Sequence, residues 1–165
     1  MKNLVVILLF LNLNAFAQND FDKAKLIDQT IYKYSSKTNN RIKLPKIEFD
    51  SIKVNAFRRR NYIQANNFFK KSATQITIMY YFDNDSLRLI KVTEPSPSSK
   101  ECYFIHSFYI ENKKIFFERE GSQVSAIYAE IGLPNNKSVY EIFGYNRFLN
   151  IEFLKKYVFE LYHKL

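Results

Sequence analysis

The chain has 165 residues, of which 47% are hydrophobic and 17% aromatic, so it holds enough apolar material for one folded core. Its formal net charge is +9 at pH 7, a property that bears on partners and solubility rather than on the fold. Cys102 is the only cysteine, which excludes an internal disulfide framework. Its apolar surroundings indicate a small buried hydrophobe rather than a reactive thiol.

The first 17 residues have the pattern of a secretory signal peptide. Lys2 supplies a basic start, residues 4–11 form an uninterrupted apolar run, and the Ala-Phe-Ala triplet at 15–17 is a small-x-small cleavage site. The run is much shorter than the roughly 20 residues that span a bilayer. We therefore expect cleavage after Ala17 and an exported product, periplasmic or secreted, with a single α+β domain over residues 18–165. Because no cysteine stands at the cleavage site and no later segment is long and apolar, we expect neither a lipid anchor nor a transmembrane segment.

Charge is unevenly distributed along the expected mature chain. Residues 18–71 contain 13 Lys or Arg and 5 Asp or Glu, whereas residues 72–165 contain 11 of each kind. The positive excess therefore lies in the first third of the mature chain, where an anionic partner is more plausible than in the near-neutral remainder.

The N-terminal part of the mature chain predicts one helix and one strand. The helix begins at Phe21 after a cap at Asp20. Its apolar face is formed by Ala24, Ile27, Ile31 and Tyr34. A strand with imperfect alternation is predicted over residues 47–54. Residues 55–71 have no clean period of two and contain several asparagines, so an irregular or partly helical segment is expected there.

The clearest strand alternation forms two similar hairpins, over residues 76–92 and 102–119. Aligned at an offset of 28 positions, the turn sequence Asp-Asn-Asp-Ser of the first matches Glu-Asn-Lys-Lys of the second. Asn and Asp favour turns because their side chains bond the local backbone and tolerate unusual dihedral angles. A Pro/Ser connector over residues 94–99 separates the hairpins, and residues 123–131 are predicted as a further strand or a short helix.

The chain closes with an amphipathic helix that Asn150 is placed to cap. Its apolar stripe consists of Ile151, Leu154, Tyr157, Val158, Leu161, Tyr162 and Leu165, and it predicts packing on the sheet. The fold class is then α+β: an N-terminal helix, an antiparallel meander of about 4–6 strands built on the two hairpins, and the C-terminal helix. This outline resembles cystatin-like and NTF2-like folds in architecture, a resemblance that implies no activity.

No catalytic, metal or cofactor site is predicted. The two histidines, His106 and His163, are far apart in sequence, so no ligand cluster has metal-binding spacing. His106 lies between Phe104 and Phe108 on an apolar strand face, which favours a core or groove histidine over a ligand. The chain lacks a nucleophile elbow and has only three glycines, too few to favour a phosphate-binding loop.

The best functional lead is a run of basic and aromatic residues between positions 58 and 71. Cations beside exposed rings suit nucleic acid, but the expected export favours an anionic envelope polymer or an acidic protein. The alternative is that Phe57, Phe68 and Phe69 belong to the core and the charges merely solvate a loop. The predicted binding residues are Arg58, Arg59, Arg60, Tyr62, Lys70 and Lys71.

Three functions are compatible with this sequence. We favour an exported, non-catalytic binding module of unknown specificity. The second is a small periplasmic hydrolase or isomerase with a pocket near His106, in which Glu118 and Glu120 would face a cleft. The third is an inhibitor or immunity-type protein that acts through its surface. The absence of a motif does not exclude an enzyme, because a triad can assemble from scattered positions.

Overall fold

A computed structural model describes residues 19–32, 41–49, 51–95, 102–124 and 151–165. The strands are β1 (Ile42–Lys43), β2 (Ile47–Phe49), β3 (Ile52–Arg59), β4 (Tyr62–Phe69), β5 (Thr74–Asp83), β6 (Ser86–Pro95), β7 (Cys102–Glu111) and β8 (Lys114–Val124). An N-terminal helix covers residues 19–32, and the C-terminal helix is α4 (Ile151–Lys164). The predicted α+β class, with one antiparallel sheet and a helix at each end of the chain, is confirmed.

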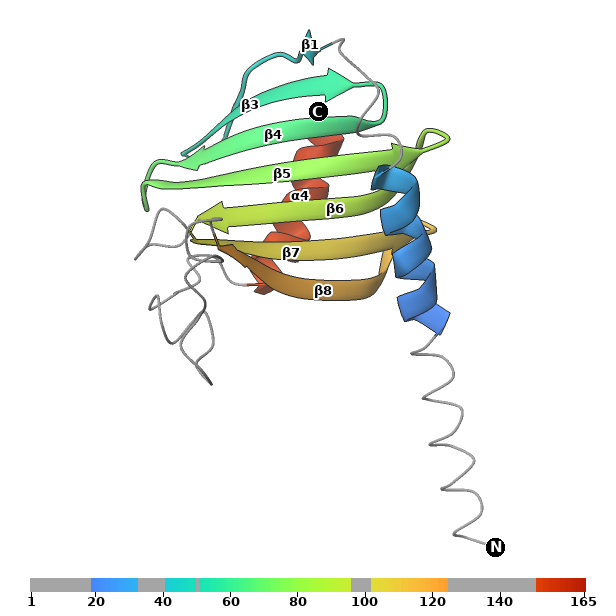
Figure 1. Ribbon diagram of the computed structural model, residues 1–165. Coiled ribbons are helices and arrows are strands. Elements are labelled where there is room, and N and C mark those ends of the chain that lie inside the picture. The colour runs from blue at the N-terminus through green and yellow to red at the C-terminus, as the bar shows by residue number, and fades with distance from the viewer. Residues whose placement is uncertain (1–18, 33–40, 50, 96–101, 125–150) are drawn as a thin grey trace, which may run out of the picture.

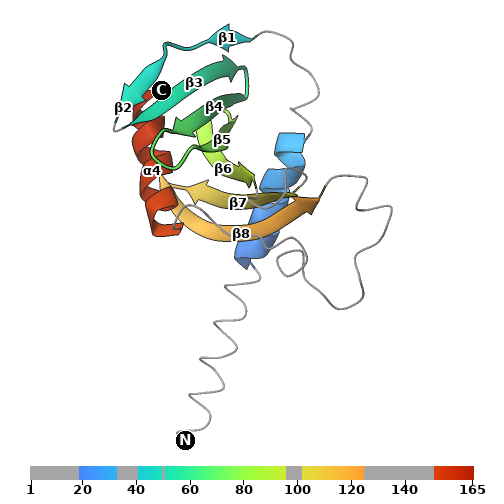
Figure 2. The ribbon, with the colours of Figure 1, turned by 90° about the vertical axis from the view of Figure 1, so that its left-hand side faces the viewer.

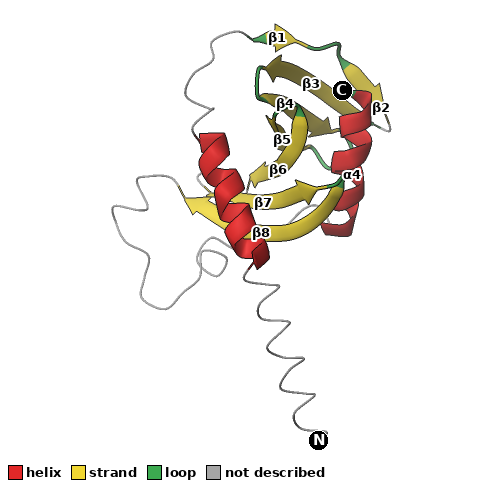
Figure 3. Ribbon diagram, turned by 90° about the vertical axis from the view of Figure 1, so that its right-hand side faces the viewer, coloured by secondary structure: helices red, strands yellow, loops and turns green. Residues whose placement is uncertain are grey.

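The strands form a meander in which neighbours in sequence are neighbours in space. Their order is β1-β3-β4-β5-β6-β7-β8, with β2 also paired to β3. Figure 1 shows α4 crossing behind the sheet, while the N-terminal helix lies in front of it beside the β5–β6 and β7–β8 turns. Figures 2 and 3, which look along the strands, show a curved sheet with the two helices on opposite sides.

The sheet has eight strands, more than the 4–6 expected, chiefly because residues 52–69 form a regular hairpin. The expectation of an irregular or partly helical segment over residues 55–71 is wrong. Inward positions of this hairpin hold Ala56, Ala65 and the fully buried Asn67, whereas Phe68 lies outward and exposed. Polar and apolar side chains are therefore not separated between the two faces of this hairpin, which is why its sequence shows no clear alternation.

The single strand predicted over residues 47–54 is two antiparallel strands. Ser51 has a φ of 66°, and this left-handed residue allows the chain to reverse between β2 and β3. Phe49 then pairs with Ile52, and Ile47 with Val54. A reversal of two residues without glycine or proline leaves little trace in the sequence, which is why residues 47–54 were predicted as one strand.

The two hairpins over β5–β6 and β7–β8 turn and bend at equivalent positions. The φ angles of Asn84 and Asp85 are 48° and 59°, and those of Asn112 and Lys113 are 51° and 63°. Two consecutive left-handed residues match the twist of the flanking strands. Register shifts follow at Tyr81/Phe82 and Tyr109/Ile110, again 28 positions apart.

Helix α4 covers one face of the sheet with its predicted apolar stripe. Leu154, Val158 and Leu161 are each 0% exposed and lie in one cluster with inward residues of β3 to β7. Two polar contacts fix the helix on this apolar layer. The Tyr80 hydroxyl donates to the Val158 carbonyl at 2.8 Å, and the Tyr157 hydroxyl donates to Asn67 Oδ1 at 2.7 Å.

The N-terminal helix covers part of the opposite face. Its buried residues Ala24 and Ile27 lie against Leu89 and Tyr109, with Ile31 packed beside them. The helix lies in the predicted region, but residues 19 and 20 are already helical, so the predicted cap at Asp20 is wrong. The expected fourth apolar residue, Tyr34, lies outside the described residues. Cys102 is buried, as expected of a small core residue.

Several predictions fall on parts of the chain that the structure does not describe. These are the signal peptide over residues 1–17, most of the Pro/Ser connector, residues 125–131 and the cap at Asn150. Among the described helices, none combines the length and the apolar character that a membrane crossing requires.

Candidate functional site

The β3–β4 hairpin separates the six predicted binding residues into two groups. Arg59 pairs with Tyr62 at the hairpin turn, which contains Arg60. Lys70 and Lys71 follow β4 at the other end, and strands of eight residues put about 25 Å between the two ends. The two groups therefore cannot form one compact site.

At the turn end, the sheet brings a further arginine to the group. Strand β1 pairs with β3 so that Ile42 lies opposite Arg58, which places Arg41 beside Arg59. We call the set of Arg41, Arg58, Arg59 and Arg60 the arginine end. Sequence analysis missed Arg41 because it joins the others only through the pairing of a two-residue strand.

Aromatic rings hold three of these guanidinium groups. The Arg41 guanidinium carbon lies 3.7 Å from the centroid of the Phe57 ring, and the Arg59 carbon lies 5.7 Å from that of Tyr62. On the other face of β3, the Arg58 carbon lies 5.9 Å from the Phe82 ring. Planar guanidinium groups stack well on aromatic faces and still present N–H donors in a fixed fork.

Two of the three phenylalanines of the basic stretch belong to the core. Phe57 is 6% exposed and Phe69 is 8% exposed, whereas Phe68 is 40% exposed. The expectation that these rings belong to the core is thus confirmed for Phe57 and Phe69 and is wrong for Phe68, and the expected loop is a strand hairpin. Tyr62 is wedged between Phe57 and Tyr81, with ring centroids 6.4 Å and 5.9 Å away. These rings act as a rigid support for the cations rather than as open stacking platforms.

The charges of the arginine end are largely uncompensated. Within the described ranges, no carboxylate forms an ion pair with Arg41, Arg58 or Arg60, and all three side chains are exposed. A pocket of about 250 Å³ adjoins them, lined by Arg41, Lys43 and Phe57 with the amides of Asn55 and Asn66. Guanidinium forks beside amide groups are suited to anionic oxygens.

The opposite end of the hairpin is electrostatically different. Lys70 forms an ion pair with Glu48 on β2. Hydrogen bonding to Lys70, together with its charge, lowers the pKa of the Glu48 carboxyl group. One of the two predicted lysines is therefore already paired, which leaves Lys71 as an isolated exposed cation and a weaker candidate for binding.

A second polar cluster surrounds the buried His106 on the α4 side of the sheet. His106 Nδ1 lies 3.1 Å from Glu120 Oε1, and Nε2 lies 3.4 Å from Glu118 Oε2. The other Glu118 oxygen lies 2.8 Å from Lys155 Nζ on α4, and this hydrogen bond raises the pKa of Lys155. The structure thus brings together the His106, Glu118 and Glu120 side chains that sequence analysis considered for a cleft.

The geometry of this cluster favours a structural role over catalysis. Both ring nitrogens of His106 face carboxylates, and an imidazolium can donate to both. A general base acting on a substrate would have to give up one of these contacts. His163, the other histidine, lies on the last turn of α4. Among the residues that the structure describes, no three His, Cys, Asp or Glu side chains are grouped to hold a metal ion.

Comparison with known proteins identifies no family or relative of this chain. No protein-family model matches the chain, and no curated protein or solved structure shows significant similarity to it. The sequence pattern and the geometry and charge of the described residues therefore have to support any function.

Proposed function

We propose that the protein is an exported, non-catalytic binding module that holds an anionic polymer of the cell envelope through the arginine end. The observation that supports this proposal is that four arginines lie at one end of the β3–β4 hairpin and that three of them have a guanidinium group over an aromatic ring. Arg41, Arg58 and Arg60 also have no carboxylate partner within the described part of the chain. Clustered charges of one sign raise the local concentration of ions of the opposite sign, so these cations favour an anionic partner.

The arrangement suits a polymer better than an acidic protein. Arg41 lies beside the end of β1, Arg58 and Arg59 lie at the end of β3, and Arg60 lies in the β3–β4 turn, so the charges are spread over both faces of this end of the sheet and do not form one closed pocket. Protein interfaces usually add a cluster of buried aromatic or aliphatic anchors. Here Ile42, which is 65% exposed, is the large apolar side chain exposed among the arginines.

Nucleic acid is a weaker candidate for the same surface. Proteins that bind single strands stack bases on open aromatic faces. In this protein, Phe57 is buried beneath Arg41, and Tyr62 is only partly exposed, with two other rings and the Arg59 guanidinium group beside it. The expected export of the chain also separates it from most cellular nucleic acid, which leaves phosphate, sulfate or carboxylate groups of envelope polymers as the favoured ligands.

The proposal is tested by comparing two triple variants with the same loss of charge. One replaces Arg41, Arg58 and Arg60 with Gln; the other replaces the exposed Lys53, Lys71 and Lys156 with Gln. On a sulfated polysaccharide (heparin) at 0.05 M salt, the arginine variant should bind roughly tenfold more weakly, since each exposed contact contributes a few tenths of a kcal/mol or more. The lysine variant should lose much less.

A third variant with Lys at positions 41, 58 and 60 keeps the charge and removes the stacked forks, so an intermediate loss is expected. Equal weakening in the arginine and lysine variants would overturn the local site. Binding to polyglutamate but not to heparin would assign the surface to an acidic protein instead. The proposal also includes export, which is tested by measuring the mass of the mature chain from the native host. The expected N-terminus after cleavage is Gln18.

A further inference from the structure

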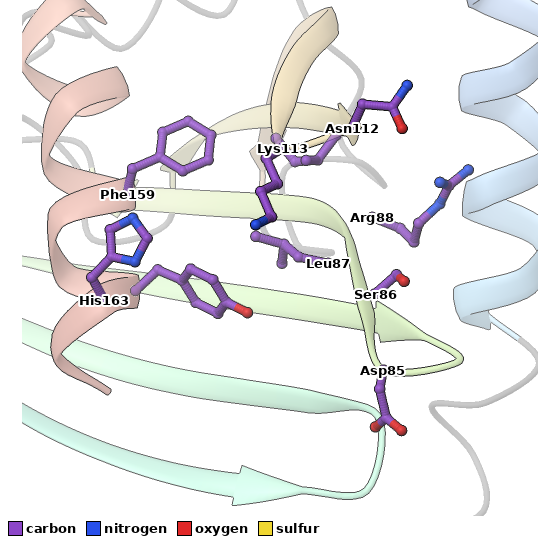
Figure 4. A pocket seen from close by; sticks show the side chains of 10 residues that line it. Asp85, Ser86, Leu87, Arg88, Asn112, Lys113, Phe159 and His163 are labelled. Atoms are coloured by element: carbon purple, nitrogen blue, oxygen red, sulfur yellow. The ribbon is translucent and has the colours of Figure 1, made fainter.

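A pocket of about 590 Å³ lies on the α4 side of the sheet, where the two hairpin turns meet the last turn of the helix. Figure 4 shows its walls: Phe159 and His163 come from α4, Leu87 from β6, and Lys113 from the β7–β8 turn. It shares no lining residue with the arginine end. Its volume lies within the range of roughly 300–1,000 Å³ that is usual for small-molecule sites.

The apolar walls of the pocket are held in place by the core. Ile110, at the base of the pocket, is 1% exposed, and Leu87 and Phe159 pack partly buried against the same core cluster. The Tyr162 ring is fixed between α4 and the sheet, with its centroid 5.4 Å from that of Tyr80. A ligand would therefore meet a preformed surface, which lowers the entropic cost of binding.

The polar lining of the pocket includes the cations Lys113 and Arg88, the His163 imidazole and the Asp85 carboxylate, with Ser86 and Asn112 beside them. In Figure 4, Lys113 extends its ammonium group into the space between the α4 side chains and Leu87, and the His163 ring points toward the same space. Lys113 forms no ion pair with any described residue. The backbone contributes to this geometry, because the φ of 63° at Lys113 places it as the second residue of a tight turn.

The carboxylate that could neutralise Lys113 is turned away from it. Asp85 holds the equivalent position in the other hairpin turn, with a φ of 59°, and in Figure 4 its side chain points away from the pocket. Arg88 also lines the pocket, but its guanidinium group is directed toward the N-terminal helix. Lys113 and His163 are therefore the groups placed to contact a charged ligand.

We propose that this pocket binds an amphipathic small-molecule anion. One carboxylate, sulfonate or phosphate group would lie between Lys113 and His163, and an aromatic or alkyl body would rest on Phe159, Leu87 and Ile110. The ammonium and imidazole groups recognise the anion through charge-assisted hydrogen bonds. The apolar walls contribute affinity in proportion to the ligand surface that they remove from water.

The test uses two probes that differ in charge and share one ring system. 2-Naphthoate is the anionic probe and 2-naphthalenemethanol the neutral one, and each is titrated by calorimetry and by chemical-shift changes. The wild-type protein should bind 2-naphthoate saturably at one site and the neutral probe more weakly. Lys113→Gln should weaken 2-naphthoate about three- to tenfold, as expected for one partly exposed charge-assisted contact, and leave the neutral probe unchanged.

The chain offers a matched control at the next position. Lys114 carries the same charge but does not line the pocket, so Lys114→Gln should leave both affinities unchanged. Asp85→Asn removes a repelling charge and should tighten 2-naphthoate slightly. Phe159→Leu should weaken both probes, because it reduces the apolar wall that they share. Lys113→Asn, whose side chain tolerates positive φ, replaces Lys113→Gln if that variant folds poorly.

Three results would overturn the proposal: no saturable binding of 2-naphthoate, equal affinity for both probes, or equal effects of Lys113→Gln and Lys114→Gln. The variant with Gln at positions 41, 58 and 60 separates this site from the proposed function. It should retain normal 2-naphthoate binding while losing polymer binding, so each of the two proposals can be contradicted without affecting the other.

Discussion

The two helices cover opposite faces of one sheet by different means. Helix α4 buries Leu154, Val158 and Leu161 completely in a continuous apolar cluster. The N-terminal helix buries only Ala24 and Ile27 against the other face. Because apolar burial is the main source of stability, α4 is an integral part of the core and the N-terminal helix is an added layer.

Polar contacts at the edge of its interface compensate for the small apolar area of the N-terminal helix. Asp28 accepts hydrogen bonds from the buried Tyr109 hydroxyl at 3.0 Å and from Arg119 Nη2 at 2.7 Å. Lys23 forms an ion pair with Glu111 at 3.4 Å. On α4, by contrast, the hydrogen bonds of Tyr80 and Tyr157 lie inside the apolar layer. Apolar burial therefore holds α4 on its face of the sheet, whereas specific polar pairs contribute more to the position of the N-terminal helix.

The largest expected effect is the loss of stability at alkaline pH, because buried tyrosines lie under both helices. Burial raises the pKa of Tyr81 to about 12, and burial also raises the pKa values of Tyr80, Tyr109 and Tyr157 above the usual value. The folded protein therefore keeps protons that the unfolded chain releases above about pH 10. Stability should be fully present below pH 10 and fall as the pH rises toward 12.

Urea unfolding at pH 8, 9, 10 and 11 measures this loss as a falling midpoint. Tyr81→Phe should flatten the decline above pH 10, since it removes one titrating group and only a weak contact to the Met79 sulfur. A midpoint that stays constant from pH 8 to pH 11 would contradict the burial of these hydroxyl groups.

The next largest effect is expected at the α4 interface. Leu161→Ala should lower the free energy of unfolding by about 2–5 kcal/mol, because the side chain is completely buried and its removal leaves a cavity. Lys156→Ala, on the exposed side of the same helix, should change it by no more than about 0.5 kcal/mol. Similar losses in the two variants, measured by urea unfolding, would mean that α4 is not part of the core.

A smaller loss is expected at the N-terminal helix. Asp28→Ala removes the acceptor of the buried Tyr109 hydroxyl and the partner of Arg119, so it should cost about 1–2 kcal/mol. Asp28→Asn keeps an acceptor oxygen and should cost less. Hydrogen exchange provides the sharper measurement: amides of residues 19–32 should lose protection in Asp28→Ala while those of α4 keep theirs. Equal loss of protection in both helices would show that the two layers unfold as one.

The smallest effect is expected at the ion pairs of Lys155, one of which joins α4 to β8. Lys155→Ala removes the contacts to Glu118 and Glu152, which are partly exposed, so the loss should be about 0–1 kcal/mol. The loss should shrink further at 1 M salt, because salt screens exposed pairs. A loss as large as that of Leu161→Ala would indicate that the Glu118–His106 network, rather than apolar burial, holds α4 in place.

Local patterns in the sequence predicted the elements whose burial follows their period. The 3.6-residue spacing of Leu154, Val158 and Leu161 predicted α4, and the alternation of Ile76, Ile78 and Tyr80 predicted β5, because in both cases one face is uniformly apolar. The same method failed between residues 55 and 71. There the buried Asn67 is stabilised by the distant Tyr157 hydroxyl, and no local pattern reveals such a partner.

The candidate sites also combine features that the sequence predicts with features that only the fold creates. The basic character of residues 58–71 is visible in the sequence, but the distance between Arg60 and Lys70 follows from the length of the hairpin. Arg41 reaches the others only through the pairing of β1 with β3. The pocket between Lys113 and His163 exists only because α4 returns to the hairpin turns.

From the sequence alone follow the fold class, the two helices, the uneven charge and the residue types available for binding. These depend on composition and on periods of two or 3.6 residues, which act over a few neighbouring positions. The number of strands, the separation of the basic residues and the pocket beside α4 can be seen only in the tertiary structure. They depend on strand register and on contacts between residues far apart in the chain, and a local pattern carries no information about such contacts.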